Sequence, residues 1–255
     1  MTMPIRDPRP RSQQIAAELR ADIMAGDLPP GSRLPSTAHL AARYEAPGAT
    51  IQNAVAILKQ EGYVEGRVGK GVYVRPTQQQ TITPVDYARP AEPGQPYTWI
   101  TAAADHGQRG ASRLLGVGEV PAPAQVAWAF GVEPGAPVVR RTQILSLDDA
   151  PVELVHSYYP VDLARGTPLA ERRRIRGGSP AVLADMGLEP VSFEDVLSTR
   201  PPTPEEFVAL ELPVEVPILR TFRVSIAASG RPVEALILIK AGHRHEIRYR
   251  WPVGR

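Results

Sequence analysis

Apolar residues recur with helical spacing in the first quarter of the chain. Ile15, Leu19 and Ile23 are separated by four residues each and therefore share one face of a helix. We expect this helix to begin near Ser12, a residue type that caps helices, and to end at Gly26. A turn rich in proline and glycine separates it from the next helical pattern.

Two further helical patterns follow, with a tight turn between them. Ser36 occupies an N-cap position before Leu40 and Tyr44, which fall on one helical face. Pro47 and Gly48 mark the turn. The third segment places apolar residues at i, i+3, i+4 and i+7, namely Ile51, Ala54, Val55 and Leu58. This spacing predicts an amphipathic helix of about three turns.

A hairpin pattern completes this region. Gly62 stands where a glycine ends a helix. Residues 63–65 and 72–74 have the composition of short strands, and they flank residues 66–71, a glycine-rich tip with basic side chains. Two helices joined by a tight turn and followed by a basic hairpin predict a winged helix-turn-helix.

Beyond about residue 110 the pattern changes to strands at hairpin spacing. Turn signals at 148–150 and 229–231 each separate two strand-like segments. Strands are expected over residues 114–120, 138–147, 152–159, 191–199, 217–226, 232–239 and 245–251. Helices are expected over residues 121–130, 180–186 and 203–210, the last opening with a capping box. The pattern predicts an α+β domain in which helices pack on one antiparallel sheet.

Residues 77–109 are rich in proline, glutamine and threonine and show little periodicity. Such a composition is typical of an interdomain linker. We therefore expect a winged helix-turn-helix domain over residues 1–76, a linker over 77–109 and an α+β domain over 110–255. Trp99 and Ile100 either begin the second domain or pack on it.

Composition narrows the class of protein. The 255 residues, 43% of them hydrophobic, suffice for two domains with cores of their own. The absence of cysteine excludes a disulfide framework and thiolate zinc sites. No apolar run has the length of a transmembrane helix, and the N-terminus lacks an apolar signal segment, so we expect a cytoplasmic protein that does not enter a membrane. Basic side chains outnumber acidic ones only through residue 80, which suits a DNA-binding module joined to a neutral one.

Short motifs accompany these elements. In the first domain they are residues 26–36 (GDLPPGSRLPS), 40–41 (LA), Thr50, 54–58 (AVAIL), 61–62 (EG) and 69–71 (GKG). Together they resemble the GntR family of bacterial transcription regulators. In the second domain they are residues 134–140 (PGAPVVR), 151–153 (PVE), 157–160 (SYYP) and 230–234 (GRPVE). These resemble the UTRA effector-binding domain of the HutC-like GntR subfamily, which is similar in fold to chorismate lyase.

The resemblance implies a homodimer that binds a palindromic DNA operator, represses transcription and releases the DNA when a small-molecule effector binds. A ligand-independent DNA-binding accessory factor is a second hypothesis. A lyase-like enzyme fused to a DNA-binding module is a third, resting on likeness of fold alone. The chain contains none of the common nucleophile, phosphate-loop, dinucleotide or zinc-protease motifs, so we expect neither enzymatic activity nor a cofactor.

The second and third helices and the hairpin supply candidate DNA contacts. The family usually carries arginine where this chain has Ala38, Gly48 and Gln52, so we expect a different operator sequence. The candidates are Arg33, Ser36, Arg43, Thr50, Gln52, Asn53, Arg67, Gly69 and Lys70. Gln52 and Asn53 suit adenine edges in the major groove, and the basic hairpin residues suit phosphates or a minor groove. An ordinary solvated surface residue is the alternative for each.

Candidate effector contacts lie on the expected strands of the second domain. Arg141 and Gln143 alternate onto one face of the first hairpin, and we expect His156 and Tyr158 to join them from its partner strand. Glu234 resembles a ligand-contacting glutamate of the family. The full set is Arg140, Arg141, Gln143, His156, Tyr158, Arg223 and Glu234.

The arginines of this set, with Arg220, suit a carboxylate effector, because a guanidinium binds a carboxylate through two parallel hydrogen bonds. Sugar-phosphate-binding relatives carry arginine where this chain has Gln143 and Leu145, which argues against a sugar phosphate. His243 and His245, with His156, are candidate metal ligands, but no carboxylate accompanies them and we expect no metal site. The segments DDAPVEL and ASGRPVEA look alike, which indicates either a duplicated hairpin or shared turn chemistry.

Overall fold

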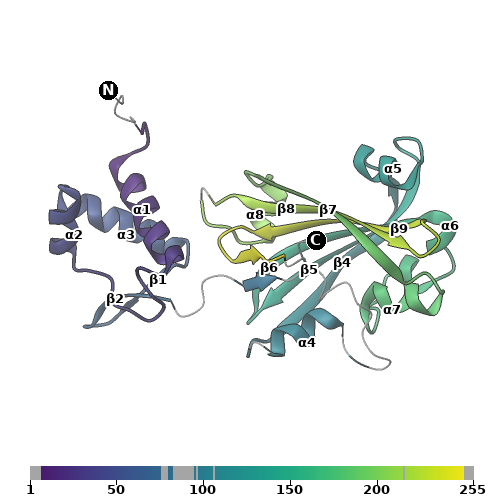
Figure 1. Cartoon of the computed structure of the whole chain (residues 1–255), viewed down its shortest axis with the longest axis horizontal. Helices are drawn as coiled ribbons and strands as arrows, with labels where there is room; N and C mark the ends of the chain where they lie inside the picture. The colour runs from purple at the N-terminus through teal and green to yellow at the C-terminus, as the bar shows by residue number, and fades with distance from the viewer. Residues whose placement is uncertain are drawn as a thin grey trace, which may run out of the picture. The chain divides into compact units, whose positions relative to one another are not determined.

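The chain divides into two compact units, one over Met1–Gln80 and one over Thr81–Arg255 (Figure 1). The computed structural model describes residues 7–75, 80–82, 95, 97–105, 107–214 and 216–249. Each unit is built around its own sheet and helices.

The first unit contains three helices and a two-stranded hairpin, as the sequence predicts. Its elements are α1 (Arg11–Ala25), α2 (Thr37–Tyr44), α3 (Gly48–Gln60), β1 (Val64–Arg67) and β2 (Gly71–Val74). Ile15 and Leu19 of α1 pack against Ile51 and Leu58 of α3 in a core from which water is excluded. The expected winged helix-turn-helix is confirmed.

Helix ends in this unit follow the predicted chemistry in all but one case. The Ser36 hydroxyl accepts a hydrogen bond of 3.2 Å from the backbone N–H of His39 and so caps α2. Gly26 ends α1 with a φ of 87°, a backbone region in which only glycine is free of strain. Ser12 is not a cap: α1 begins one residue earlier, after Pro10, whose fixed φ suits the entry to a helix.

A partly buried ion pair joins the first and third helices. Arg20 donates to both carboxylate oxygens of Glu61, at 2.8 Å from Nε and 2.6 Å from Nη2. Glu61 follows the last turn of α3 and is only 6% exposed. A bidentate contact of this kind fixes direction as well as distance, so it sets the orientation of α3 on α1.

The second unit is a six-stranded antiparallel sheet in the order β4-β5-β6-β9-β8-β7. Its strands are β4 (Gly110–Pro121), β5 (Pro137–Leu147), β6 (Ala150–Pro160), β7 (Pro190–Arg200), β8 (Ile218–Ala227) and β9 (Pro232–Ala241). A separate short pair joins β3 (Gln80–Ile82) to β10 (His245–Ile247). The predicted α+β class and antiparallel sheet are confirmed.

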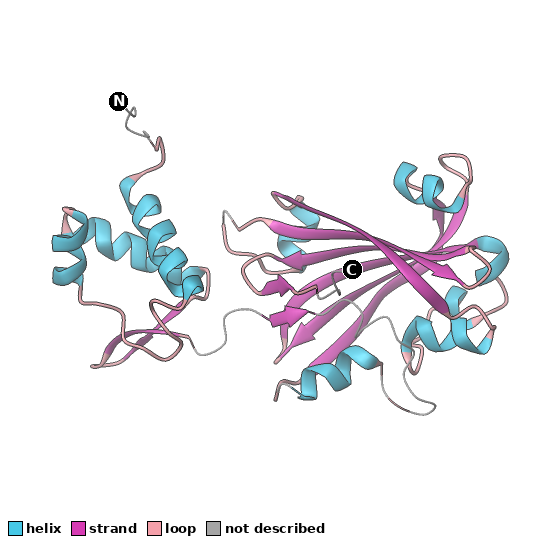
Figure 2. Ribbon diagram, viewed as in Figure 1, coloured by secondary structure: helices cyan, strands magenta, loops and turns pink. Residues whose placement is uncertain are grey.

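Helices cover both faces of this sheet (Figure 2). The helices of the unit are α4 (Thr98–Asp105), α5 (Ala124–Phe130), α6 (Val161–Ala164), the 3-10 turn η2 (Pro168–Ala170), α7 (Gly178–Asp185) and α8 (Pro204–Ala209). Apolar side chains of α4, α6, η2 and α7 pack on one face. Those of α5 and α8 pack on the other.

Both central hairpins carry a β-bulge just after their turn. In the first hairpin Ser146 pairs with Pro151, but Leu145 pairs with Glu153, so Val152 is an extra residue. In the second, Ile226 pairs with Pro232 and Ser225 with Glu234, so Val233 is the extra residue. A bulge shifts the register of a hairpin by one residue and exchanges the faces on which its side chains lie.

Several elements differ from their predicted extents. The range expected to be a linker includes α4, in which Trp99 is 2% exposed and packs on the sheet of the second unit. The capping box predicted for α8 is present, with Thr203 and Glu206 as its two members. The last strand, expected over residues 245–251, is described only for His245–Ile247. The expected end of that strand, from residue 250, lies outside the described residues. Among the helices that the structure describes, none is long and apolar enough to cross a membrane.

We predict that Leu58→Ala lowers the free energy of unfolding of the first unit by about 2–5 kcal/mol, because it opens a cavity where α1, α3 and the hairpin meet. Gln60→Ala, at an exposed position of the same helix, serves as the control and changes it by less than about 0.5 kcal/mol. Urea denaturation followed by circular dichroism measures both variants. Equal losses in the two variants would contradict the assigned core.

Candidate DNA interface and effector pocket

The start of α3 presents polar side chains to solvent. Gln52 and Asn53 are exposed, and Thr50 is half-buried beside them, while Ile51 and Ala54 point into the core. The alternation follows from helical geometry, since residues that face the core recur every three or four positions. The exposed side of α3 is therefore rigidly held and free to enter a groove.

The basic residues expected near α3 are held in defined positions. Arg43 donates to Asp22 at 2.9 Å and lies 5.0 Å from the centre of the Tyr44 ring. The Arg33 guanidinium lies over Gly71, where a Cβ atom would come within 3.0 Å of Nε. Both arginines are exposed, so their outer faces stay accessible to an anion.

The β1–β2 hairpin forms the wing. Arg67 is ion-paired with Glu65 at 3.1 Å and lies 4.3 Å from the centre of the Tyr73 ring. Gly69 has a φ of 69°, which lets the chain turn sharply at the tip. Lys70 is exposed, and among the described residues its ammonium group has no ion-pair partner. The wing thus combines one anchored and one unpaired cation.

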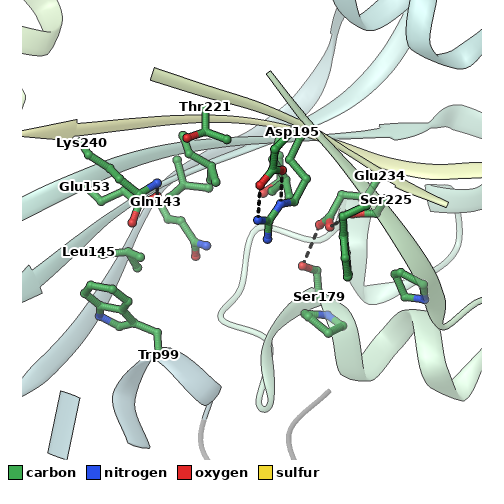
Figure 3. A pocket seen from close by; sticks show the side chains of 18 of the residues that line it. Trp99, Gln143, Leu145, Glu153, Ser179, Asp195, Thr221, Ser225, Glu234 and Lys240 are labelled. Carbon is green, nitrogen blue, oxygen red and sulfur yellow. Dashed lines mark hydrogen bonds and ion pairs between the residues drawn. The ribbon is translucent and has the colours of Figure 1, made fainter. Parts of the chain in front are cut away.

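A pocket opens on one face of the second unit's sheet, between α4 and α7 (Figure 3). Its open space is about 840 Å³, including the part that opens to solvent. Trp99 contributes from α4 and Ser179 from α7. Strands β5 to β9 supply the floor, with side chains from Gln143, Glu153, Asp195, Arg223, Glu234 and Lys240.

Two ion pairs lie in this floor. Arg223 donates to both oxygens of Asp195, at 2.7 Å from Nε and 2.7 Å from Nη2. Lys240 donates to Glu153 at 2.7 Å. All four side chains are at most 11% exposed. Burial would raise the pKa of Asp195, but the hydrogen bonds and charge of Arg223 outweigh it and hold that pKa below its usual value.

Glu234 is the third carboxyl group of the floor and has no ion-pair partner at hydrogen-bond distance among the described residues. Instead it accepts hydrogen bonds from three hydroxyl groups, Tyr159 at 2.6 Å, Ser179 at 3.0 Å and Ser225 at 3.3 Å. Burial raises the pKa of Glu234, and these hydrogen bonds oppose the rise. Because Ser179 is in α7, Glu234 also ties that helix to the sheet.

Of the residues expected to contact an effector, Gln143, Arg223 and Glu234 line the pocket. Arg140, His156 and Tyr158 do not: they lie on the opposite face of the sheet, as their pairing with one another and with Thr142 shows. The expected alignment of His156 and Tyr158 with Gln143 is wrong because the bulge at Val152 exchanges the faces of β6. Arg220 also lies on the opposite face, where it donates to Gln125 at 2.6 Å.

Arg141 lies beside the pocket and holds a loop. Its guanidinium donates to four backbone carbonyls of residues 168–173, the shortest contacts being 2.8 Å to Glu171 and 2.8 Å to Arg173. These contacts tie the loop before α7 to β5. Arg141 therefore supports one wall of the site, and its donors are directed at the chain itself.

Two known protein families match this chain, one in each of its two units. The UTRA domain family matches residues 105–246, and the family described as bacterial regulatory proteins, gntR family, matches residues 11–74. The chain is a GntR-family transcriptional regulator with a UTRA domain. The first match spans the sheet and its pocket, and the second spans α1 to the wing.

Individual relatives agree with the family. The HTH-type transcriptional regulator RB1450 of Rhizobium meliloti (strain 1021) is 29% identical over 224 residues, which are 87% of each chain. The HTH-type transcriptional regulator Rv0792c of Mycobacterium tuberculosis is 26% identical over 96% of this chain and 85% of that protein. The crystal structure of PhnF from Mycobacterium smegmatis is similar in fold, with a TM-score of 0.59 and 22% identity over 94% of this chain and 100% of that one.

Sequence reasoning missed part of the floor of this GntR regulator. Glu153 and Glu234 occupy equivalent places, each directly after a bulged valine, in the two similar segments DDAPVEL and ASGRPVEA. That repetition was the signal for Glu153. Asp195, Thr221 and Lys240 also line the pocket, but no repeated sequence motif in their strands indicated them.

The histidine pair of the second unit is buried, and the described part of the chain contains no group of three or more His, Cys, Asp or Glu side chains that could hold a metal ion. Burial lowers the pKa of His243 to about 4 and that of His245 to about 3. Both rings are therefore neutral near pH 7, as a packed structural histidine requires.

We predict that ionisation of Glu234 lowers the free energy of unfolding of the second unit as the pH rises. Since its folded pKa lies above the ordinary value of 4.5, its contribution is fully present below that pH and is lost as the pH rises through the folded pKa. Glu234→Gln should remove this decline, because the amide cannot ionise. Urea denaturation at several pH values measures the slope, with exposed Glu194→Gln as the control. An unchanged slope in Glu234→Gln would show that another group titrates.

Proposed function

We propose that this regulator is a repressor that binds a palindromic operator as a homodimer and releases it when a small molecule occupies the pocket. One observation carries the proposal: a single chain combines an exposed, rigidly held α3 and wing with a separate unit whose pocket has a pre-built polar floor. A polar floor inside a concave, partly apolar site is typical of ligand recognition. A DNA-binding accessory factor without a ligand has no need of it.

Dimerisation follows from how a helix-turn-helix reads DNA. One such unit covers a single half-site, and specific binding normally uses two recognition helices in successive major grooves, about 34 Å apart. A two-fold symmetric dimer then requires an inverted repeat in the operator. In this arrangement Thr50, Gln52 and Asn53 reach base edges, and Arg33, Ser36, Arg43, Arg67, Gly69 and Lys70 lie against the backbone or the minor groove.

Release requires that the ligand bind the DNA-bound and DNA-free arrangements with different affinity. The pocket is suitably placed in the chain for this. Tyr97 and Trp99, which line it, belong to the segment that follows the first unit in sequence. A ligand that contacts these side chains changes the free energy of the segment through which the first unit is attached.

Footprinting of the purified protein on the DNA upstream of its own gene tests the proposal directly. We expect protection of an inverted repeat whose half-sites are one helical turn apart, and loss of protection when the effector is added. Binding that is indifferent to sequence would remove the repressor function. Sequence-specific binding that no small molecule relieves would leave the accessory factor as the better description.

Two substitutions separate base contacts from backbone contacts. Gln52→Ala should relax specificity at one or two base pairs, at a cost of about 1–3 kcal/mol on the specific site alone. Lys70→Ala should weaken binding to every sequence and reduce the salt dependence by about one unit. Fluorescence anisotropy on operator and random DNA at several salt concentrations measures both. Equal losses on the two DNAs for Gln52→Ala would refute its base contact.

A further inference from the structure

The two cations in the floor of the pocket are each paired with a carboxylate, which restricts the ligand. Arg223 is paired with Asp195, and Lys240 with Glu153, each at 2.7 Å. Glu234 receives three hydroxyl donors. A ligand that brought a full charge would find the charges of both ion pairs already compensated, and an uncompensated buried charge is strongly unfavourable.

The groups left unmatched are neutral. The Thr221 hydroxyl lines the pocket, is 2% exposed as a residue, and makes no hydrogen bond within the described structure. Gln143 accepts a hydrogen bond from Ser112 at 3.2 Å through its amide oxygen, while its amide nitrogen donates to no described group. A buried hydroxyl without a partner is costly, so it indicates a partner that arrives with the ligand.

The strand register places these two neutral groups in one row. Gln143 pairs with Val155, Val155 with Leu238, and Leu238 with Thr221, so all four side chains share the pocket face. The ends of the row are roughly 14 Å apart between Cα atoms, at about 4.8 Å per strand. The row thus has an apolar middle, Val155 and Leu238, and a polar side chain at each end, and a ligand can lie along it.

The ion pairs flank this row on both sides. The row on one side, nearer the turn between β5 and β6, contains Glu153 paired with Lys240. One row in the other direction, Arg223 pairs with Asp195. Figure 3 shows Gln143, Glu153 and Lys240 at one end of the site, with Glu234 and Ser225 at the other. Carboxylate oxygens therefore border a neutral strip, and each carboxylate has more lone pairs than the hydrogen bonds it accepts there.

We propose, on the basis of the repressor function above, that the effector is an uncharged polyol or sugar. A hydroxyl group both donates and accepts, so it can satisfy Thr221, accept from the Gln143 amide and donate to the flanking carboxylates. The faces of a sugar ring expose C–H groups that pack on Val155, Leu238 and the aromatic side chain of Trp99. An uncharged polyol or sugar thus supplies several donors and acceptors together with an apolar face.

A carboxylate effector, the expectation from the arginines, fits this geometry less well. Arg140 and Arg220 lie on the opposite face, and Arg141 donates to backbone carbonyls. Arg223 lines the pocket, but its charge is neutralised by Asp195. A cationic effector meets the same difficulty, because the charges of Asp195 and Glu153 are already neutralised by Arg223 and Lys240.

The test is a thermal-shift and operator-release assay on the full-length protein with four pools of compounds built on the same carbon skeletons. The pools are free monosaccharides and polyols, their phosphate monoesters, their sugar acids and their amino sugars. We expect only the neutral pool to raise the melting temperature and release the operator. Release by a charged pool alone, or by none of the four, would overturn the uncharged sugar effector and leave the repressor function standing, since footprinting tests that function separately.

Variants tie the response to the neutral row. Thr221→Val keeps the shape of the side chain and removes an unpaired buried hydroxyl, so the free protein should be at least as stable as the parent. Its affinity for the active compound should fall about tenfold, the equivalent of 1.4 kcal/mol. Thr142→Val, on the opposite face, is the control and should respond like the parent. An unchanged affinity in Thr221→Val would overturn the assignment of the row, and a fall in Thr142→Val of the same size would do so too.

Discussion

Pairing of buried charges is the constraint on which the second unit depends. Its sheet places Glu153, Asp195, Arg223, Glu234 and Lys240 on one face, beneath α4 and α7, where water does not reach them freely. Each must find a partner within the protein, and the register of the strands supplies it. A floor of this kind stabilises the fold less than a hydrophobic one of equal size. A charged floor of this kind is therefore better suited to recognition than to stabilising the fold.

The two β-bulges make that floor possible. Without the extra residue at Val152, Glu153 would pair with Ile144 instead of Leu145 and would lie on the face of the sheet opposite to Gln143. The same displacement at Val233 brings Glu234 under Ser179 and Tyr159. Two short segments that share the sequence PVE thus deliver two glutamates to one pocket from neighbouring strands.

Much of the fold could be predicted from sequence because its signals are local. The periodicity of Ile51 and Leu58, the Ser36 cap and the Thr203 capping box each act within one turn of helix. The pocket could be predicted only in part, since face assignment depends on register and a single bulge reverses it. His156 and Tyr158 were misplaced for that reason. Asp195 and Lys240 escaped notice because their partners, Arg223 and Glu153, are distant in sequence.

The central claim is that occupancy of the pocket and binding of DNA are linked, and thermodynamic reciprocity tests it most directly. Isothermal titration gives the operator affinity with and without the releasing compound, and the compound's affinity with and without the operator. Linkage requires the two ratios to be equal, and a ratio of about 5–150 is typical of such coupling. A compound that binds the free and the operator-bound protein with equal affinity would show that the pocket does not control the DNA-binding unit.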